Sequence, residues 1–246
     1  MGVAFAALIG LILGSFVATL VLRWPADRSV LGRSRCDGCQ QPLGPLDLVP
    51  LVSAVRLRGR CRSCGAPIDR FHSIVELGAA LIGGIALAVL PGTSGWLWAL
   101  FGWLLLPLAL FDARHFWLPD RLSAALAVAG LLLAGPLLGA PLLDRWIGAL
   151  AGGAALGLIA WAYRRARGGD GMGGGDPKLV AAIGCWLGWQ ALPLMLLLAS
   201  LGGIIWALLV QRKRDQPLAQ RPVPFGVFVC TAAFTTVPLW PLISGR

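Results

Sequence analysis

The sequence predicts an all-α polytopic membrane protein of about eight transmembrane helices, with a small cytoplasmic zinc-binding loop domain. Of its 246 residues, 57% are hydrophobic and only 13% are charged, which is more apolar surface than one soluble core can bury. The apolar residues gather in long runs, and four of the six cysteines lie in the longest polar stretch between them. Lipid is therefore the expected solvent for most of the chain.

Apolar runs of about 20 residues, some of them shorter, mark the expected spans. They lie at roughly 2–22, 76–94, 95–111, 122–140, 146–163, 177–190, 191–210 and 222–243. The first run is not expected to be a cleaved signal peptide, because no basic residue precedes it and Arg23 follows it. We therefore expect this helix to remain in the protein, with its N-terminus outside.

The basic residues test this topology. Eight spans that start outside place alternate loops in the cytoplasm, and 19 of the 21 basic residues fall in those loops, leaving Arg145 and Arg246 outside. This asymmetry explains the net charge of +10, and no basic motif with interleaved aromatics indicates a nucleic acid partner. The predicted parts are a transmembrane helix (1–22), a cytoplasmic four-cysteine domain (23–75) and a second transmembrane domain (76–246) surrounded by membrane lipids.

Two Cys-x-x-Cys pairs, separated by 21 residues, occupy the loop domain. Their members are Cys36, Cys39, Cys61 and Cys64. Such pairs suit tetrahedral coordination of Zn²⁺, and four thiolates leave no open position, so a structural zinc ion is expected. Two disulfides are the alternative, although cytoplasmic thiols stay reduced, and a redox pair would need a longer domain. The remaining cysteines, Cys185 and Cys230, fall in apolar runs and are expected to pack there.

Two acidic residues, Asp112 and Asp176, stand at the ends of apolar runs. Taken singly, Asp176 is simply the N-cap of a helix that starts at Pro177, and Asp112 and Asp120 are interfacial carboxylates. In the topology drawn from the charges, however, Asp112 and Asp176 lie at the cytoplasmic ends of their helices and can face each other. Two carboxylates that share a site supply one acid and one base, which can activate water against a peptide carbonyl.

Five segments of the chain, in the right order, resemble the type IV prepilin leader peptidases. Gly171–Gly188, in which three glycines precede the aspartate, is similar to their GxGD segment, and Asp112–Asp120 is similar to their other aspartate motif. Arg58–Cys64, followed by Ile74–Leu77, resembles the cytoplasmic domain of the bifunctional bacterial members. Gly14–Pro25, with its Gly-Ser-Phe and Arg-Trp-Pro triplets, resembles their N-terminal motif.

The resemblance implies a membrane aspartic endopeptidase with Asp112 and Asp176 as its catalytic pair. Its substrates would be prepilins or pseudopilins of type IV pilus or protein secretion systems, whose short basic leader is cut at the cytoplasmic face of the inner membrane. Bifunctional members then methylate the new N-terminus with S-adenosylmethionine. Glu76 is the residue that we expect to hold the amine or orient the donor, unless it only caps or charges the start of its helix.

Two positions depart from the family pattern. Ala18 replaces a common Asn, and Phe71-His72 replaces an aromatic-Pro pair, which bears on methylation more than on proteolysis. Two other classes of protein stay open. A small polytopic transporter fits the helices and aspartates but needs no zinc loop, and no inverted repeat is visible. A zinc-bearing membrane scaffold fits the cysteines but gives the glycine-rich turn and the aspartates no purpose.

Overall fold

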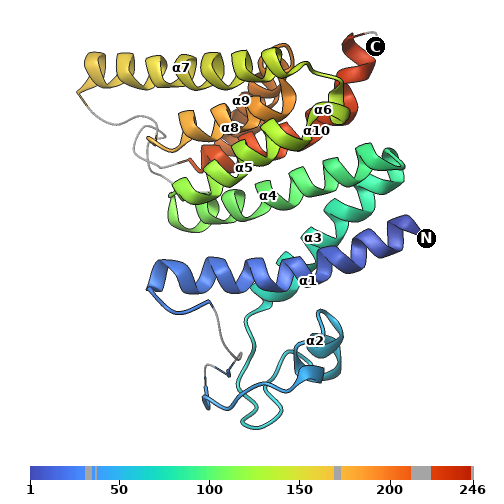
Figure 1. The fold of residues 1–246 in the computed structure, drawn as a ribbon. Helices are drawn as coiled ribbons and strands as arrows, with labels where there is room; N and C mark the ends of the chain where they lie inside the picture. Colours follow the sequence, from blue (N-terminus) through green and yellow to red (C-terminus); the bar gives the residue numbers. More distant parts are fainter. Residues whose placement is uncertain (31–34, 37, 169–172, 212–222, 245–246) are drawn as a thin grey trace. The chain divides into compact units, whose positions relative to one another are not determined.

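The computed structural model describes residues 1–30, 35–36, 38–168, 173–211 and 223–244. The chain forms two compact units, Met1–Pro91 and Gly92–Arg246, each of which is described by itself. Within the described residues the regular elements are helices, apart from two isolated β-bridges in the loop of the first unit (Figure 1). The all-α prediction is confirmed. The predicted basic loop at 212–221 lies outside the described residues.

The first unit is built on two long helices, α1 (Gly2–Arg23) and α3 (Arg70–Val89), which pack along each other. Two glycines of α1 allow this, because a side chain at Gly10 or Gly14 would collide with the backbone of α3. A Cβ at Gly14 would lie 2.6 Å from the Cα atom of Glu76. Glycines four residues apart permit the same close approach in other membrane helix pairs. The loop between α1 and α3 carries the short helix α2 (Val52–Arg56).

The helix α3 begins earlier than its predicted span at 76–94. It starts at Arg70, because the side chain of Asp69 caps it by accepting a hydrogen bond from the N–H of Phe71 at 2.9 Å. The polar residues of this first turn hid the helix from a hydropathy reading. The break before the next helix falls at Gly92, whose φ of 84° is incompatible with a right-handed helix.

The second unit consists of seven helices within its described residues. They are α4 (Thr93–His115), α5 (Asp120–Leu133), α6 (Gly135–Leu138), α7 (Leu142–Arg167), α8 (Asp176–Leu187), α9 (Leu192–Gln211) and α10 (Phe225–Ser244). The run at 122–140, predicted as one helix, is divided into α5 and α6. The reason is Pro136, which has no N–H to donate and whose ring clashes with the preceding helical turn.

Six helices of the described chain are long and apolar enough to cross a bilayer, namely α1, α3, α4, α7, α9 and α10. The other two predicted spans correspond to α5 and α8, which have 14 and 12 residues. These lengths fall below the roughly 17 residues that an upright crossing requires. The helix α8 is instead a core helix, since every residue from Leu179 to Leu187 except Ala181 is buried.

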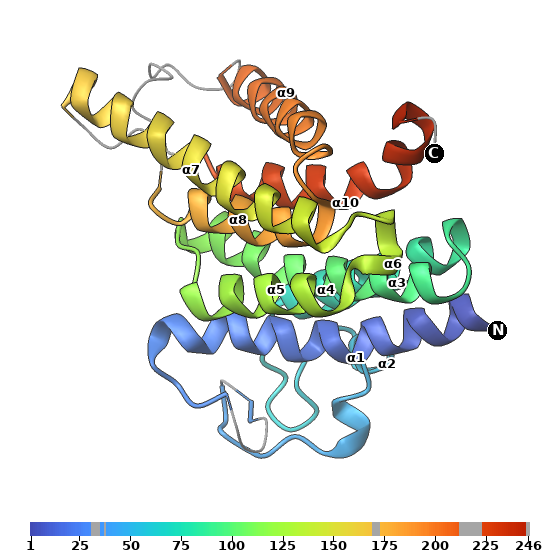
Figure 2. The ribbon, with the colours of Figure 1, turned by 45° about the horizontal axis from the view of Figure 1, so that its top comes forward.

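Packing fixes α8 from three sides. Gly148 of α7 and Gly184 of α8 face each other with no room for a side chain on either. The indole N–H of Trp186 donates to the carbonyl oxygen of Leu126 in α5 at 2.8 Å, and its ring stacks on Phe101 of α4 with centroids 4.8 Å apart. Figure 2 shows α8 enclosed between α7, α5 and α10. These contacts hold α8, and with it Asp176 at its start, in place.

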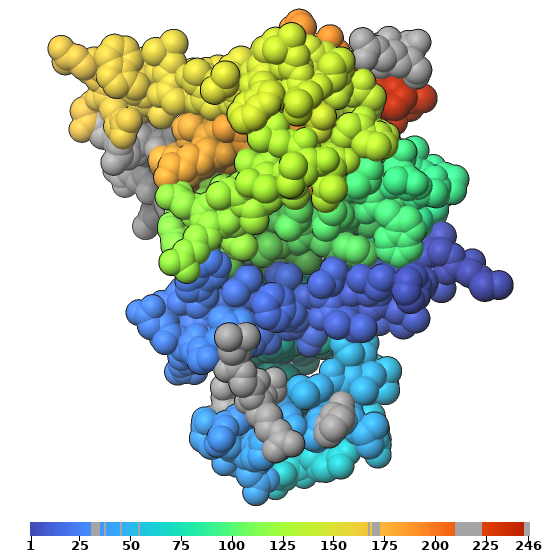
Figure 3. Space-filling model, viewed as in Figure 1, coloured from blue at the N-terminus to red at the C-terminus, as the bar shows by residue number. Residues whose placement is uncertain are grey.

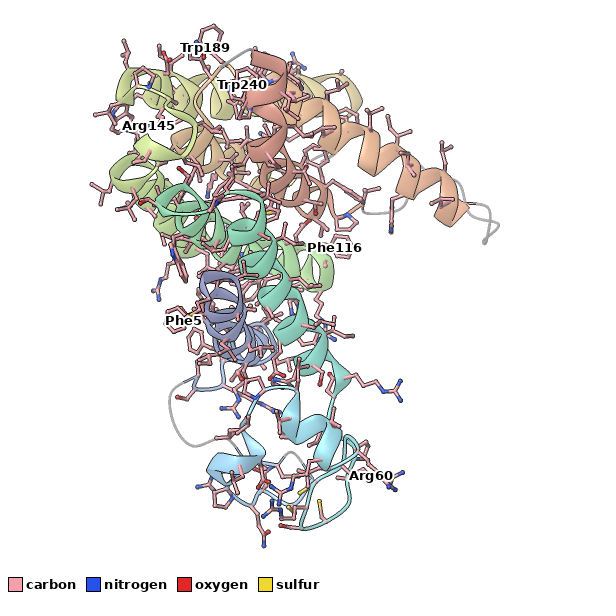
Figure 4. The ribbon with its side chains drawn as sticks, turned by 90° about the vertical axis from the view of Figure 1, so that its right-hand side faces the viewer. Phe5, Arg60, Phe116, Arg145, Trp189 and Trp240 are labelled. Atoms are coloured by element: carbon pink, nitrogen blue, oxygen red, sulfur yellow. The ribbon has the colours of Figure 1, made fainter. Side chains whose placement is uncertain are left out.

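Arg145, which the charge pattern assigned to an outer loop, is a buried structural residue. Its Nη1 donates to the carbonyl oxygens of Gly130 at 2.8 Å and Leu131 at 3.2 Å. The carbonyl oxygen of Gly130 also accepts the N–H of Ala134, so Arg145 adds a further donor at the end of α5. Figure 4 labels Arg145 near Trp189, and in Figure 3 the residues around α6 and the start of α7 form a continuous yellow-green surface.

Candidate active site

Asp112 lies in the last turn of α4 and is buried, with only 6% of its surface exposed. The helix ends at His115, because Phe116 turns into the left-handed region with a φ of 51° and donates its N–H to the Asp112 carbonyl oxygen. A buried carboxylate needs hydrogen-bond donors. The N–H of Val227 donates to Asp112 Oδ2 at 3.1 Å, and the backbone of Gly226 also interacts with the carboxylate. Both donors belong to the first turn of α10.

Asp176 is the first residue of α8 and is buried to the same extent as Asp112. The N-cap of this helix is Gly175, so the interpretation of Asp176 as a helix cap is wrong. Its carboxylate interacts instead with the backbone of Gly173 and with the charge of Asp112. Gly175 has a role in packing, since a Cβ there would lie 2.8 Å from the Cβ atom of Leu118.

The charge of Asp112 acts on the carboxylate of Asp176. Burial, together with the negative charge of Asp112, raises the pKa of Asp176 from 3.8 to about 6. Asp176 precedes the apolar part of α8, and α8 is not among the helices long enough to span a membrane. With this raised pKa, Asp176 keeps its proton to a higher pH than an ordinary aspartate does.

Asp120 lies at the edge of this pair and faces solvent. It opens α5, and its two carboxylate oxygens lie 2.7 Å and 2.8 Å from Nζ of Lys178 in α8. The side chains of Asp120 and Lys178 are 69% and 56% exposed, so the ion pair contributes at most about 1 kcal/mol. It nevertheless ties the start of α5 to the first turn of α8, beside the contact between Leu118 and Gly175.

The four cysteines come together in the loop of the first unit. The sulfur atoms of Cys36, Cys39, Cys61 and Cys64 all lie within 4.8 Å of one another, and no disulfide joins them. A tetrahedral zinc ion with bonds of about 2.3 Å requires sulfur atoms about 3.8 Å apart. The Sγ atoms of Cys36 and Cys64 are 3.8 Å apart, which fits such an ion. Figure 4 shows Arg60 beside these sulfur atoms.

The described residues of the two Cys-x-x-Cys turns form corresponding hydrogen bonds. The N–H of Gln40 donates to the Cys36 carbonyl oxygen at 2.8 Å, and the N–H of Gly65 donates to that of Cys61 at 3.0 Å. Gln40 and Gly65, which each follow the second cysteine of a pair, have φ values of 58° and 70°. Hydrogen bonds from the following backbone, first that of Cys64, lower the pKa of the Cys61 thiol to about 6. The pKa of Cys64 moves the other way, to about 11. A hydrogen bond from the backbone of Ala66 lowers it, but the side chain of Cys39, burial and the other two cysteines together outweigh that bond. Of these two thiols, Cys61 is the one that favours the metal-binding thiolate.

Glu76 is buried in the second turn of α3, where its Oε2 accepts a hydrogen bond from the N–H of Leu51 at 2.9 Å. Because α3 starts at Arg70, the interpretation of Glu76 as a cap or charge at a helix start is wrong. Leu51 has a φ of 58°, which residues other than glycine rarely adopt. Glu76 therefore links α3 to the loop that carries the cysteines.

Two contacts of this region were not predicted from the sequence. The first joins the start of α10 to Asp112, although the helix itself was predicted at 222–243 and Gly226 is a local signal for a close approach. The second is the ion pair of Lys178, which was counted only as a basic loop residue. The sequence around Gly226 or Lys178 does not indicate the partner of either residue, because Asp112 and Asp120 lie far away along the chain.

Comparisons with known proteins cover both units. Residues 8–90 match the bacterial peptidase A24 N-terminal domain, and residues 99–208 match the type IV leader peptidase family. A prepilin leader peptidase/N-methyltransferase of Aeromonas hydrophila is 40% identical, over 88% of this chain and 74% of that protein. Proteins of the same name from Burkholderia pseudomallei and Pseudomonas aeruginosa are each 35% identical, over 100% and 95% of this chain and 89% and 88% of theirs. No solved structure matches the chain.

Proposed function

Because this chain belongs to the type IV leader peptidase family, we propose that Asp112 and Asp176 form the catalytic pair with which it removes the leader from prepilins or pseudopilins. The observation that carries the proposal is the pairing of two buried carboxylates, from α4 and α8, within the second unit. The transporter and scaffold alternatives lose their support, since the relatives that cover most of the chain are named leader peptidases and N-methyltransferases.

The proposed reaction is hydrolysis of a peptide bond by an acid and a base. The base takes a proton from a water molecule, whose oxygen attacks the scissile carbonyl carbon, while the acid donates its proton to the carbonyl oxygen. When the C–N bond breaks, the leaving amine receives a proton from the pair. Asp112 suits the base, because the N–H groups of α10 stabilise its negative charge. Asp176, with a pKa raised to about 6, suits the acid.

The cut is proposed to occur at the cytoplasmic face of the inner membrane. Six apolar helices and the family indicate a multi-pass membrane protein. Support for the orientation comes from the basic residues, which gather in the loops that follow Arg23, Arg114 and Arg164. The last two loops share one side because α5, together with α6, is proposed to carry the chain back across the bilayer between α4 and α7. Reporter fusions at 112–121 and at 164–176 should both be found inside, and a reporter outside at either position would contradict the proposal.

Methylation of the new N-terminus is proposed as a second activity, because the relatives are also named N-methyltransferases. S-adenosylmethionine would supply the methyl group, and the attacking amine would lose a proton. We assign Glu76 to hold the amine or orient the donor, since it is a buried carboxylate beside the cysteine loop. Glu76→Gln keeps an acceptor for the N–H of Leu51 but removes the charge. It should abolish methylation and spare cleavage, and normal methylation would contradict the role.

A zinc ion is proposed at Cys36, Cys39, Cys61 and Cys64. The sulfur separations and the corresponding hydrogen bonds of the two turns support it. Four thiolate ligands would leave the metal no open position, so it would hold the loop and take no part in hydrolysis. The described residues of the loop bury little, since Val49, Val52 and Val55 are exposed, and a metal commonly replaces a missing core of this kind.

Cleavage of a prepilin by the purified protein tests the catalytic pair. Asp112→Asn and Asp176→Asn should each lower the rate by about 10³-fold or more, because neither asparagine can accept or donate the proton. Asp144→Asn is the matched control, since Asp144 accepts a hydrogen bond from Trp189 that an asparagine oxygen can also accept. Cleavage retained by either of the first two variants would refute the assignment.

A further inference from the structure

We propose that the first turn of α10 positions the Asp112 carboxylate for catalysis, through the small volume of Gly226 and the N–H of Val227. The inference rests on the proposed role of Asp112. Neither residue needs to touch the substrate, so both are positioning residues. They follow Asp112 by more than 100 residues in the sequence and reach it only because α10 packs beside α4.

The contact between Gly226 and Asp112 leaves no space for a side chain. A Cβ added at Gly226 would lie 2.9 Å from both Cγ and Oδ2 of Asp112, and 3.3 Å from its Cβ. The next residue, Val227, donates its N–H to the same Oδ2 at 3.1 Å. The carboxylate is thus confined on one side by the Gly226 backbone and bound by an amide. Any larger residue at 226 has to displace the carboxylate.

The requirement for glycine at 226 is one of space and not of backbone conformation. Gly226 is absent from the glycines with positive φ, and it lies in a helical turn where alanine is the better helix former. An alanine at this position would therefore suit α10 itself. A loss of activity in Gly226→Ala would therefore come from the contact with Asp112.

A second contact holds α10 in register along α4. Pro238 has no N–H, which leaves the carbonyl oxygen of Phe234 without its helical partner. The indole N–H of Trp98 in α4 donates to that oxygen at 3.1 Å, and the Trp98 ring stacks on Phe234 with centroids 4.7 Å apart. This contact lies near the start of α4, whereas Asp112 lies near its end. The antiparallel pair is therefore fixed at both ends, which sets the first turn of α10 against Asp112.

The other titratable groups near Asp112 do not favour its ionised form. They are Asp176 of α8, which is acidic, and Cys230 of α10, a buried thiol that is influenced by both carboxylates. Among these described neighbours, the N–H groups of α10 are the ones that stabilise a negative charge on Asp112. Their loss should impair the base of the proposed reaction.

Gly226→Ala tests the positioning role. We expect kcat for leader cleavage to fall about 100-fold, because a displacement of about 1 Å misaligns the base, while KM changes by less than about twofold. Gly157→Ala is the matched control, since Gly157 lies in α7 and an added Cβ would meet nothing within 4 Å. An unchanged kcat in Gly226→Ala would overturn the inference. If Asp112→Asn itself stays active, the proposed function fails instead.

A double-mutant cycle keeps the inference testable if Gly226→Ala impairs folding. The effect of Gly226→Ala on the melting temperature should largely disappear in an Asp112→Ala background. The reason is that the Cγ and Oδ2 atoms that the new methyl group meets are then gone. An effect that persists would place the clash elsewhere and overturn the inference.

Val227→Pro removes the amide donor, and proline is tolerated in the first turn of a helix. We expect a lower kcat and an acid limb of the pH–rate profile that moves to higher pH, because ionised Asp112 loses a hydrogen bond. A merely structural role for Val227 would leave the shape of the profile unchanged, and that result would overturn its part in the inference.

Discussion

The cysteine loop and the aspartate pair are built over different distances along the chain. Each Cys-x-x-Cys turn closes within five residues, by hydrogen bonds such as that from Gln40 to Cys36. Asp112, in contrast, is bound by an amide 115 residues away, and its charge acts on Asp176 of another helix. The first site therefore depends on local turns and a proposed metal, and the second depends on the register of whole helices. We expect loss of the metal to disrupt the first site and displacement of a helix to disrupt the second.

Removal of the proposed zinc should have the largest effect on folding. Cys36→Ser together with Cys39→Ser should release the metal and unfold residues 38–64, because a structural zinc site supplies about 10 kcal/mol or more to a small domain. Zinc content and hydrogen exchange would measure both changes, and Cys185→Ser, at a buried cysteine outside the cluster, is the control. We expect methylation to be lost and leader cleavage to continue. Equal loss of both activities would show that the two regions are not separable.

Asp176→Asn should stabilise the protein while it abolishes cleavage. The folded-state pKa of Asp176, about 6, lies above the usual 3.8, so ionisation lowers the free energy of unfolding as pH rises from about 4 to about 6. Asparagine does not ionise, so the variant should be more stable above pH 6, by up to about 3 kcal/mol, with no gain at pH 4. Melting temperatures measured against pH in detergent test this. Parallel curves for the two proteins would contradict it.

The ion pair between Asp120 and Lys178 should give the smallest effect. Asp120→Asn should lower the free energy of unfolding by less than about 1 kcal/mol, since both side chains are exposed. Cleavage should fall only a few-fold, because the pair steadies the first turn of α8 and does not touch the reacting atoms. The double variant with Lys178→Met should cost little more than either single variant. A loss of cleavage as large as that expected of Asp112→Asn would move Asp120 into the catalytic pair.

Hydropathy predicted where the helices lie more accurately than where they end. All eight apolar runs contain helices, because apolar side chains in lipid require a backbone that satisfies its own hydrogen bonds. The start of α3 was missed because a cap, Asp69, and a polar first turn determine it. The division of the run at 122–140 follows from Pro136, which an average over hydrophobicity does not register.

The parts of the candidate site also differ in how far the sequence predicts them. The spacing of the cysteines predicted a cluster that the structure brings together, because two short turns need little else. The pairing of Asp112 and Asp176, predicted from the distribution of basic residues over eight spans, stays a prediction. Gly226 and Val227 could not be predicted, because their partner is reached through the packing of α10 on α4, and no local pattern encodes that contact.

The lengths of α4 and α8 have a consequence for the lipid around them. The two helices carry Asp112 near the end of one and Asp176 at the start of the other, yet they have 23 and 12 residues. At 1.5 Å per residue they cover about 34 Å and about 18 Å, against a hydrocarbon layer of about 30 Å. Lipid can match the length of α4 but does not have to match that of α8, because α8 is enclosed by α5, α7 and α10. Protein therefore surrounds the carboxylate at the start of α8, where it can supply the polar partners that a hydrocarbon layer cannot.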